Sequence, residues 1–172
     1  MDVKHLAVIR ENVSAFIKSC SEKFDKLGSM LLDIAPQDHA GAKAFFTKAE
    51  IRTLDIDPAS GADYIADICK KNDDKIESDL FDLIICTEVL EHTLNPFKAT
   101  EELNRILKPG GKICVSVPFN FRIHGPLPDC WRFTIHGLRA LFGDYTDVEI
   151  NELATPGRDL MPVHYTLTAT KK

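Results

Sequence analysis

The sequence predicts an α/β fold in which a doubly wound, mostly parallel sheet carries helices on both faces. Residues 81–86 form a short apolar run without alternation, as is typical of a strand covered by helices on both faces. Asn95 and Pro96 then match the cap and the first position of a helix. Pro109-Gly110-Gly111 is expected to end that helix, and an apolar strand follows over 113–117. Strand, helix and strand in this order form the repeating unit of a parallel sheet.

The chain before residue 81 supplies the other half of the predicted sheet. Residues 6–24 form an amphipathic helix, whose apolar residues recur at three-to-four spacing (Leu6, Ile9, Val13, Phe16, Ile17, Cys20 and Phe24). We expect this helix to pack on the sheet, with a protein partner as the alternative. Gly28-Ser29 breaks it. The elements that follow are short: strands over 30–34, 51–55 and 62–66, and a helix over 42–47.

After residue 117 the chain enters a long irregular stretch, 118–133, whose length and content of Pro and Gly are unusual for a simple connection. Loops of this kind are often functional. Thr134 can cap a helix that runs to Phe142, and two final strands are expected over 146–150 and 164–169.

Composition sets the broad class of the protein. At 172 residues and 44% hydrophobic content, the chain is expected to form one domain, 1–172, with residues 1–27 as the helix packed on its core. Five cysteines without a C-x-x-C pair indicate a reducing, cytoplasmic setting. The charged amphipathic start predicts neither a signal peptide nor a membrane span, so we expect a soluble protein. A net charge of −5 argues against a nucleic-acid partner. A homodimer remains open.

Two short motifs carry a family resemblance. Glu88-Val89-Leu90-Glu91-His92 follows the strand over 81–86, and Leu107-Lys108-Pro109-Gly110-Gly111 precedes the next strand. At this spacing the pair resembles the class I S-adenosylmethionine (SAM)-dependent methyltransferases, in particular their small type 11-like members. The resemblance implies a Rossmann-like, seven-stranded sheet whose last strand lies antiparallel between its neighbours. It also implies SAM as cofactor and an oxygen or nitrogen atom of a small-molecule, glycan or natural-product-like compound as methyl acceptor.

In open α/β sheets the ligand binds at the carboxyl ends of the strands. The resemblance implies that Asp33, at the end of the first strand, opens the cofactor loop; an aspartate that only caps the loop is the alternative. Asp55 ends the second strand, where a carboxylate can accept hydrogen bonds from ribose hydroxyls. Asp57, two residues later on the same pleat face, is the alternative. After the third strand, Asp67 resembles the adenine-binding acid of the family, with Ile68 covering the ring.

The fourth strand ends in Cys86 and Thr87, which the resemblance places at the methionine end of the cofactor, although Thr87 can equally be only a turn residue. The first loop departs from the family pattern D-x-G-x-G-x-G. Ala35 and Gln37, our further candidates for cofactor contacts, stand where glycines are usual, as does His39. This departure keeps a second hypothesis open, a catalytically weak or inactive methyltransferase-fold binding or regulatory subunit.

Methyl transfer from a sulfonium needs a general base only when the acceptor is protonated, so no universal catalytic residue is expected. His124 is the first candidate for such a base and Glu88 the second. His92, one turn beyond Glu88, is interpreted as part of the frame. No metal site is expected, because His5, His39, His136 and His164 lack a suitable mutual spacing.

The segment from His124 to Thr134 resembles an H-G-x-x-x-D-x-W-R-F-T motif of a methyltransferase subgroup. We expect His124, Asp129, Trp131 and Arg132 to bind the acceptor: Trp131 can cover a ring and Arg132 can hold an anion. A structural Asp129–Arg132 pair that locks the loop is the alternative. A nicotinamide-dependent oxidoreductase is a weaker rival, since the chain lacks G-x-G-x-x-G and that hypothesis explains neither motif.

Overall fold

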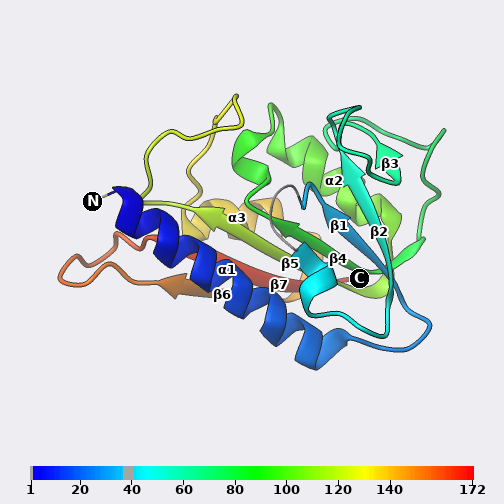
Figure 1. The fold of residues 1–172 in the computed structure, drawn as a ribbon, viewed down its shortest axis with the longest axis horizontal. Coiled ribbons are helices and arrows are strands. Elements are labelled where there is room, and N and C mark those ends of the chain that lie inside the picture. The colour runs from blue at the N-terminus through cyan, green and yellow to red at the C-terminus, as the bar shows by residue number, and fades with distance from the viewer. Residues whose placement is uncertain (1, 37–40) are drawn as a thin grey trace.

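A computed structural model describes residues 2–36 and 41–172 of the chain. Its centre is a seven-stranded sheet with the order β3-β2-β1-β4-β5-β7-β6 (Figure 1). The strands are β1 (Met30–Ile34), β2 (Glu50–Asp55), β3 (Tyr64–Ile65), β4 (Phe81–Thr87), β5 (Leu107–Pro118), β6 (Tyr145–Leu153) and β7 (His164–Lys171). The first five strands pair in parallel, and β7 runs antiparallel between β5 and β6, which confirms the predicted architecture.

Helices cover both faces of the sheet. They are α1 (Asp2–Phe24), α2 (Pro96–Ile106) and α3 (Ile135–Leu141), together with the 3₁₀ turns η1 (Gly41–Ala44) and η2 (Leu90–His92). Helix α1 crosses one face over β4, β5 and β7, as Figure 1 shows in blue. Its buried side chains form one apolar layer with η1, while α2 and α3 contribute to a second layer. None of the helices in the described part of the chain is long and apolar enough to cross a membrane.

Alternation along the buried strands explains why both faces are apolar. In β1, Leu31 belongs to the layer under α1 and Leu32 to the layer under α2, and both side chains are fully buried. In β4 the same alternation divides Ile85 from Ile84. Because successive side chains of a strand point to opposite faces, an uninterrupted apolar run fills both layers.

Two boundaries differ from the predictions. The Asn95 cap is confirmed, since its side chain accepts from the backbone amide of Lys98. However, Pro109-Gly110-Gly111 does not end α2, which stops at Ile106; these residues already lie in β5, in a register shift opposite Phe81. A Cβ on Gly111 would lie 2.8 Å from the Lys108 carbonyl oxygen, so this irregular strand needs glycine. The predicted helix over 42–47 is only the 3₁₀ turn η1.

Candidate functional site

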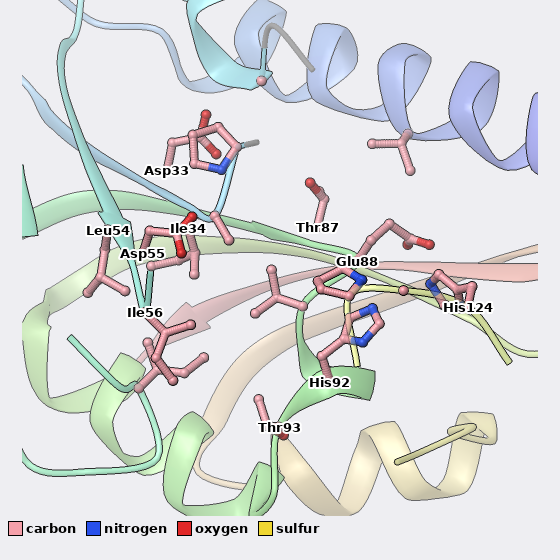
Figure 2. Close-up of a pocket in the computed structure, with 18 of the residues that line it drawn as sticks. Asp33, Ile34, Leu54, Asp55, Ile56, Thr87, Glu88, His92, Thr93 and His124 are labelled. Atoms are coloured by element: carbon pink, nitrogen blue, oxygen red, sulfur yellow. The ribbon is translucent and has the colours of Figure 1, made fainter. Parts of the chain in front are cut away.

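The carboxyl ends of β1, β2, β3 and β4 border a cleft of about 1040 Å³. It lies where the strand order reverses between β1 and β4, the usual ligand position in an open α/β sheet. Helix α1 and the loop after β5 complete its walls. Figure 2 shows Asp33, Asp55 and Ile56 on one side of the cleft and Glu88, His92 and His124 on the other. We call these the cofactor wall and the acceptor wall.

Asp33 closes the loop that follows β1. The residue is 2% exposed, and its carboxylate accepts a hydrogen bond of 2.7 Å from the Ala42 amide, on the far side of the loop. Burial raises the pKa of Asp33 to about 6, against the opposing effects of this hydrogen bond and of Lys43. A Cβ on Gly41 would lie 2.4 Å from the Asp33 Oδ2 atom, so only glycine lets the loop return this closely.

Ala35 holds the backbone conformation that glycine would otherwise supply. Its φ is +47°, in the left-handed region, and its amide donates to the Leu54 carbonyl oxygen at 2.7 Å. An alanine in this conformation costs about 1–2 kcal/mol. The loop therefore starts with the geometry of the family pattern although the glycine is missing. Gln37 and His39 lie outside the described residues.

The end of β2 distinguishes between the two predicted ribose ligands. Asp55 is 7% exposed, lines the cleft, and accepts from the Asp57 amide at 2.9 Å through Oδ1. Asp57 is exposed and does not line the cleft; its carboxylate accepts from the Ala59 amide. Ile56, which sequence reasoning missed, lines the cleft and is 67% exposed. An apolar residue directly after an acidic strand end is the signal that could have found it.

Asp67 and Ile68 line the cleft after the short strand β3. One carboxylate oxygen of Asp67 accepts from the Cys69 amide at 2.9 Å, and the other lies 3.6 Å from the Lys70 ammonium. Thr87 also lines the cleft, whereas the Cys86 side chain is fully buried in the core and does not reach it. Burial raises the pKa of the Cys86 thiol, so this group acts as a small apolar side chain.

Glu88 is held by a chain of side chains from three other elements. Its Oε1 atom accepts from Ser116 Oγ at 2.8 Å and lies 2.6 Å from His164 Nε2. His164 is fully buried on β7, and its Nδ1 atom lies 2.8 Å from the Asn12 amide nitrogen on α1. Glu88 itself has a φ of +55°. Sequence reasoning missed Asn12 and this role of His164, because no short motif joins residues so far apart in the chain.

Glu91, His92 and His124 converge beside Glu88. The Nε2 atoms of both histidines lie 3.8 Å from Glu91 Oε1, and the two rings are 4.8 Å apart. Each Nδ1 atom has its own partner: Pro128 O at 2.9 Å for His92 and Asp129 Oδ2 at 3.0 Å for His124. Glu91 is fully buried, and neither carboxylate oxygen has a hydrogen-bond partner within the described chain. Burial raises the pKa of Glu91 well above its usual range, and the Glu88 carboxylate adds to this effect.

The predicted acceptor residues divide into two groups. His124 lines the cleft, but Asp129, Trp131 and Arg132 do not. Arg132 forms a bidentate pair with the fully buried Asp129 side chain, and it also donates to carbonyl oxygens of the same loop. The Trp131 indole donates to Thr93 O at 2.7 Å. These contacts favour the alternative interpretation, in which the Asp129–Arg132 pair locks the loop.

Comparisons with known proteins identify the family and the fold of the chain. A family model described as "Methyltransferase domain" matches residues 7–153. The chain is similar to the structure of a SAM-dependent methyltransferase from Archaeoglobus fulgidus, with 15% identity, a TM-score of 0.69 and 94% of each chain covered. It is also similar to the CurJ carbon methyltransferase, with 14% identity and a TM-score of 0.67, where it spans 94% of its own length but 53% of that chain.

A third similar structure is Haemonchus contortus phosphoethanolamine N-methyltransferase 2 in complex with phosphomonomethylethanolamine and S-adenosylhomocysteine. The identity is 14% and the TM-score is 0.66. The match includes 94% of this chain and 52% of that protein. No curated protein matches the chain in sequence. At these identities the solved structures show a common fold.

Proposed function

This chain belongs to the methyltransferase domain family, for which SAM is the cofactor, and from that premise we propose that it methylates an oxygen or nitrogen atom of a small-molecule or glycan acceptor. The observation that carries the proposal is the arrangement of the cleft. Asp33 and Asp55 lie at the carboxyl ends of the neighbouring strands β1 and β2, and Asp67 lies just after β3; all three line the cleft. Glu88, His92 and His124 face Asp33 and Asp55 from the acceptor wall (Figure 2).

The residues of the cofactor wall fit SAM in shape and chemistry. The Asp55 carboxylate has one oxygen on the Asp57 amide and retains acceptor capacity for two ribose hydroxyls. Ile56 and Ile68 offer apolar surface for the adenine ring, and Asp67 can accept from its exocyclic amine. The backbone at Ala35 begins the loop after β1 in the left-handed conformation for which glycine is used.

The chemistry of the cleft follows from this arrangement. Bound SAM would supply a methyl group on a sulfonium, whose sulfur leaves as a neutral thioether. The acceptor atom forms the new bond to carbon with its own lone pair, and a protonated acceptor also gives up a proton. Glu88 and His124 line the acceptor wall and are the candidates for receiving that proton. The remaining work of the chain is to orient the acceptor and keep water out.

The backbone at Ala35 also bears on the alternative of an inactive subunit. That hypothesis started from the missing glycines, and Ala35 retains the left-handed conformation for which glycine is used. The small-molecule acceptor of the Haemonchus contortus neighbour supports, for this chain, an acceptor of comparable kind. We therefore favour an active enzyme.

Calorimetric titration with SAM and S-adenosylhomocysteine tests the cofactor half of the proposal. Asp55→Ala should weaken binding by at least about 10-fold, because it removes the hydrogen bonds of a charged acceptor, each worth about 1.5–3 kcal/mol. Asp57→Ala is the matched control, since that carboxylate is exposed and lies outside the cleft. Equal affinities for the two variants would refute the ribose assignment.

The transfer itself is tested with SAM carrying a labelled methyl group and pools of small-molecule and glycan acceptors that offer hydroxyl or amine groups. Label recovered in one pool identifies the acceptor class. A folded protein that binds neither SAM nor S-adenosylhomocysteine would overturn the enzyme assignment.

A further inference from the structure

We propose that Glu91, His92 and His124 form a binding site for a divalent transition-metal ion on the acceptor wall, and that this ion holds a hydroxyl oxygen of the methyl acceptor. The first half stands on the geometry of the three side chains alone. The second half rests on the proposed function. It narrows the acceptor from an oxygen or nitrogen atom to a hydroxyl.

The three ligand atoms already lie close together. One atom from each of Glu91, His92 and His124 lies within 4.8 Å of the other two, and both Nε2 atoms are 3.8 Å from Glu91 Oε1. Metal bonds to histidine nitrogen and carboxylate oxygen are about 2.0–2.2 Å long, which places neighbouring ligand atoms about 3–3.5 Å apart. Small side-chain rotations would therefore complete the site.

The contacts of the two Nδ1 atoms orient both histidine rings so that each can bind a metal ion through Nε2. His92 Nδ1 faces the Pro128 carbonyl oxygen, which can only accept, so the proton of the neutral ring lies on Nδ1. His124 Nδ1 faces the Asp129 carboxylate, which likewise accepts. The lone pair of each neutral ring is then on Nε2, toward Glu91. Metal-binding histidines usually have such a carbonyl or carboxylate partner behind the ring.

Glu91 provides a second, independent observation. Its side chain is 0% exposed and both of its oxygens lack a hydrogen-bond partner within the described residues. Buried polar groups are almost always hydrogen-bonded, and buried charges are paired or bind a metal. The nearby Arg132 does not meet this need, because its donors go to Asp129 and to loop carbonyl oxygens. Three acceptors thus face one another, and a cation between them satisfies all three.

The ligand set indicates the kind of ion and its use. Two imidazoles and one carboxylate suit Zn²⁺, Co²⁺, Mn²⁺ or Fe²⁺ better than Mg²⁺ or Ca²⁺, which prefer oxygen ligands. Three protein ligands leave positions open, and both histidines line the cleft. A hydroxyl bound there would be oriented and made more acidic. With His124 on the ion, Glu88 is the candidate that remains for taking up the proton.

This site differs from the expectation of no metal, which rested on His5, His39, His136 and His164. The residues that converge in the structure are instead Glu91, His92 and His124. Glu91 and His92 come from η2, and His124 comes from the loop after β5, which the Asp129–Arg132 pair holds in place. Hydrogen bonds from the amides of Cys130 and Trp131 to the Glu91 carbonyl oxygen fix this loop against η2.

Metal binding can be measured without any methyl transfer. The full chain is treated with a chelator, freed of it, and titrated with Zn²⁺ by calorimetry and with Co²⁺ by visible absorption. We expect one ion per chain, and at least about 10-fold weaker binding in Glu91→Gln, which keeps the shape of the side chain but removes a charged ligand. His124→Ala serves as a second ligand variant. His136→Asn is the control, because this exposed histidine lies outside the site. Circular dichroism confirms that each variant is folded.

The outcomes separate the two halves of the proposal. The metal site is overturned if the wild type binds neither Zn²⁺ nor Co²⁺. It is also overturned if the folded variants Glu91→Gln and His124→Ala bind these ions as tightly as the wild type does. In either case, protons alone satisfy the three groups. A metal-binding chain whose transfer activity is unchanged by chelation overturns only the role in holding the acceptor. A wild-type chain that binds the metal ion but does not bind SAM contradicts the proposed function and leaves the metal site standing.

Discussion

The two walls of the cleft are built in different ways. On the cofactor wall, carboxylates accept from backbone amides nearby in the chain: Asp33 from Ala42, nine residues on, and Asp55 from a residue two positions on. On the acceptor wall, side chains hold side chains over long separations. The contact between His164 and Glu88 spans 76 residues, and that between His164 and Asn12 spans 152.

This difference teaches which parts of the site depend on the whole fold. A carboxylate bound to a nearby amide needs only a correct local turn, so the cofactor wall depends on single backbone positions. The acceptor wall exists only after α1, β4, β5 and β7 have assembled, because Glu88 directly follows β4 and its network takes one side chain from each of the other three elements. Changes on the first wall should therefore act through loop geometry, and changes on the second through buried polar partners.

Gly41→Ala should have the largest effect, and it tests the local character of the cofactor wall. The new Cβ would lie 2.4 Å from Asp33 Oδ2, and the φ of +52° strains any other residue. Backbone strain of about 1–2 kcal/mol and overpacking of about 1–3 kcal/mol together predict a loss of about 2–5 kcal/mol in the free energy of unfolding. Denaturant unfolding measures it, and SAM affinity should fall as well.

Gly28→Ala is the matched control for that variant. Gly28 also has a positive φ, +79°, but a Cβ there meets nothing within 4 Å. Only the backbone cost of about 1–2 kcal/mol is expected. If Gly28→Ala and Gly41→Ala lower the free energy of unfolding by the same amount, the close approach to Asp33 does not contribute to the cost at Gly41.

Asp129→Asn should come next, with a loss of about 3 kcal/mol, and it tests the acceptor wall. The Asp129 carboxylate is fully buried, and its loss leaves the half-buried Arg132 without its partner. The hydrogen bond from Arg132 holds the pKa of Asp129 well below its usual range. Its stabilising effect is therefore present above about pH 4 and is lost as the pH falls through the lowered pKa. Urea unfolding at several pH values measures both.

The surface pair Lys18–Glu22 provides the control, because its side chains are 65% and 66% exposed and 4.0 Å apart. Glu22→Gln should change stability by less than about 0.5 kcal/mol. If Asp129→Asn is equally mild, the lock interpretation of the loop fails. The same variant should weaken metal binding by about 10–100-fold, because it removes the group that orients His124.

The contrast between the walls also explains what the sequence could predict. The fold follows from patterns within single elements: the apolar run of β4, the Asn95 cap and the helix after it. The three acidic residues Asp33, Asp55 and Asp67, which line the cleft, could be predicted as site candidates because each lies at or just after the end of a strand, a position that can be recognised from the sequence. The antiparallel last strand came from the family resemblance.

The acceptor wall could not be predicted in the same way. Glu91 reads as one more polar residue of a motif, and its burial without a partner is visible only once the loop after β5 lies over η2. From the sequence, Arg132 can be either a substrate ligand or the partner of Asp129 in a structural pair, and only the structure shows that its donors are used within the loop. His164 has no neighbour in sequence that suggests its contact with Glu88. Contacts between side chains that lie far apart in the chain produce no periodic pattern in the sequence from which they could be predicted.

Asp33→Asn also tests the cofactor wall, but this substitution should increase the free energy of unfolding, whereas Gly41→Ala and Asp129→Asn should lower it. Burial raises the pKa of Asp33 to about 6, so ionisation favours the unfolded state. The two states are equally protonated at low pH. The penalty grows between about pH 4 and 6 to about 3 kcal/mol, because each unit of the raised pKa corresponds to about 1.4 kcal/mol. Above pH 6, Asp33→Asn should therefore be more stable than wild type by this amount. At pH 4 the two proteins should unfold alike in urea.

A constant difference between the two proteins from pH 4 to pH 8 would contradict this account of Asp33. The amide of Asn can still accept from the Ala42 amide, so the loop should keep its course. SAM affinity is the second readout. If the negative charge at Asp33 serves the cofactor, affinity falls although stability rises, as is usual when a buried charge is kept for function.

Ala35→Gly should have the smallest effect, and it tests whether the loop retains the geometry of a glycine pattern. Glycine adopts the φ of +47° without strain, which favours the folded state by about 1–2 kcal/mol. It also gives the unfolded chain more freedom, at a cost of about 0.4–1 kcal/mol. A net gain of about 0–1.6 kcal/mol is expected in urea unfolding, with SAM affinity unchanged or higher. Ala44→Gly, in η1, has no positive φ to relieve and should lose stability instead. If both variants lose stability to the same extent, Ala35 does not hold the conformation from which the cofactor wall begins.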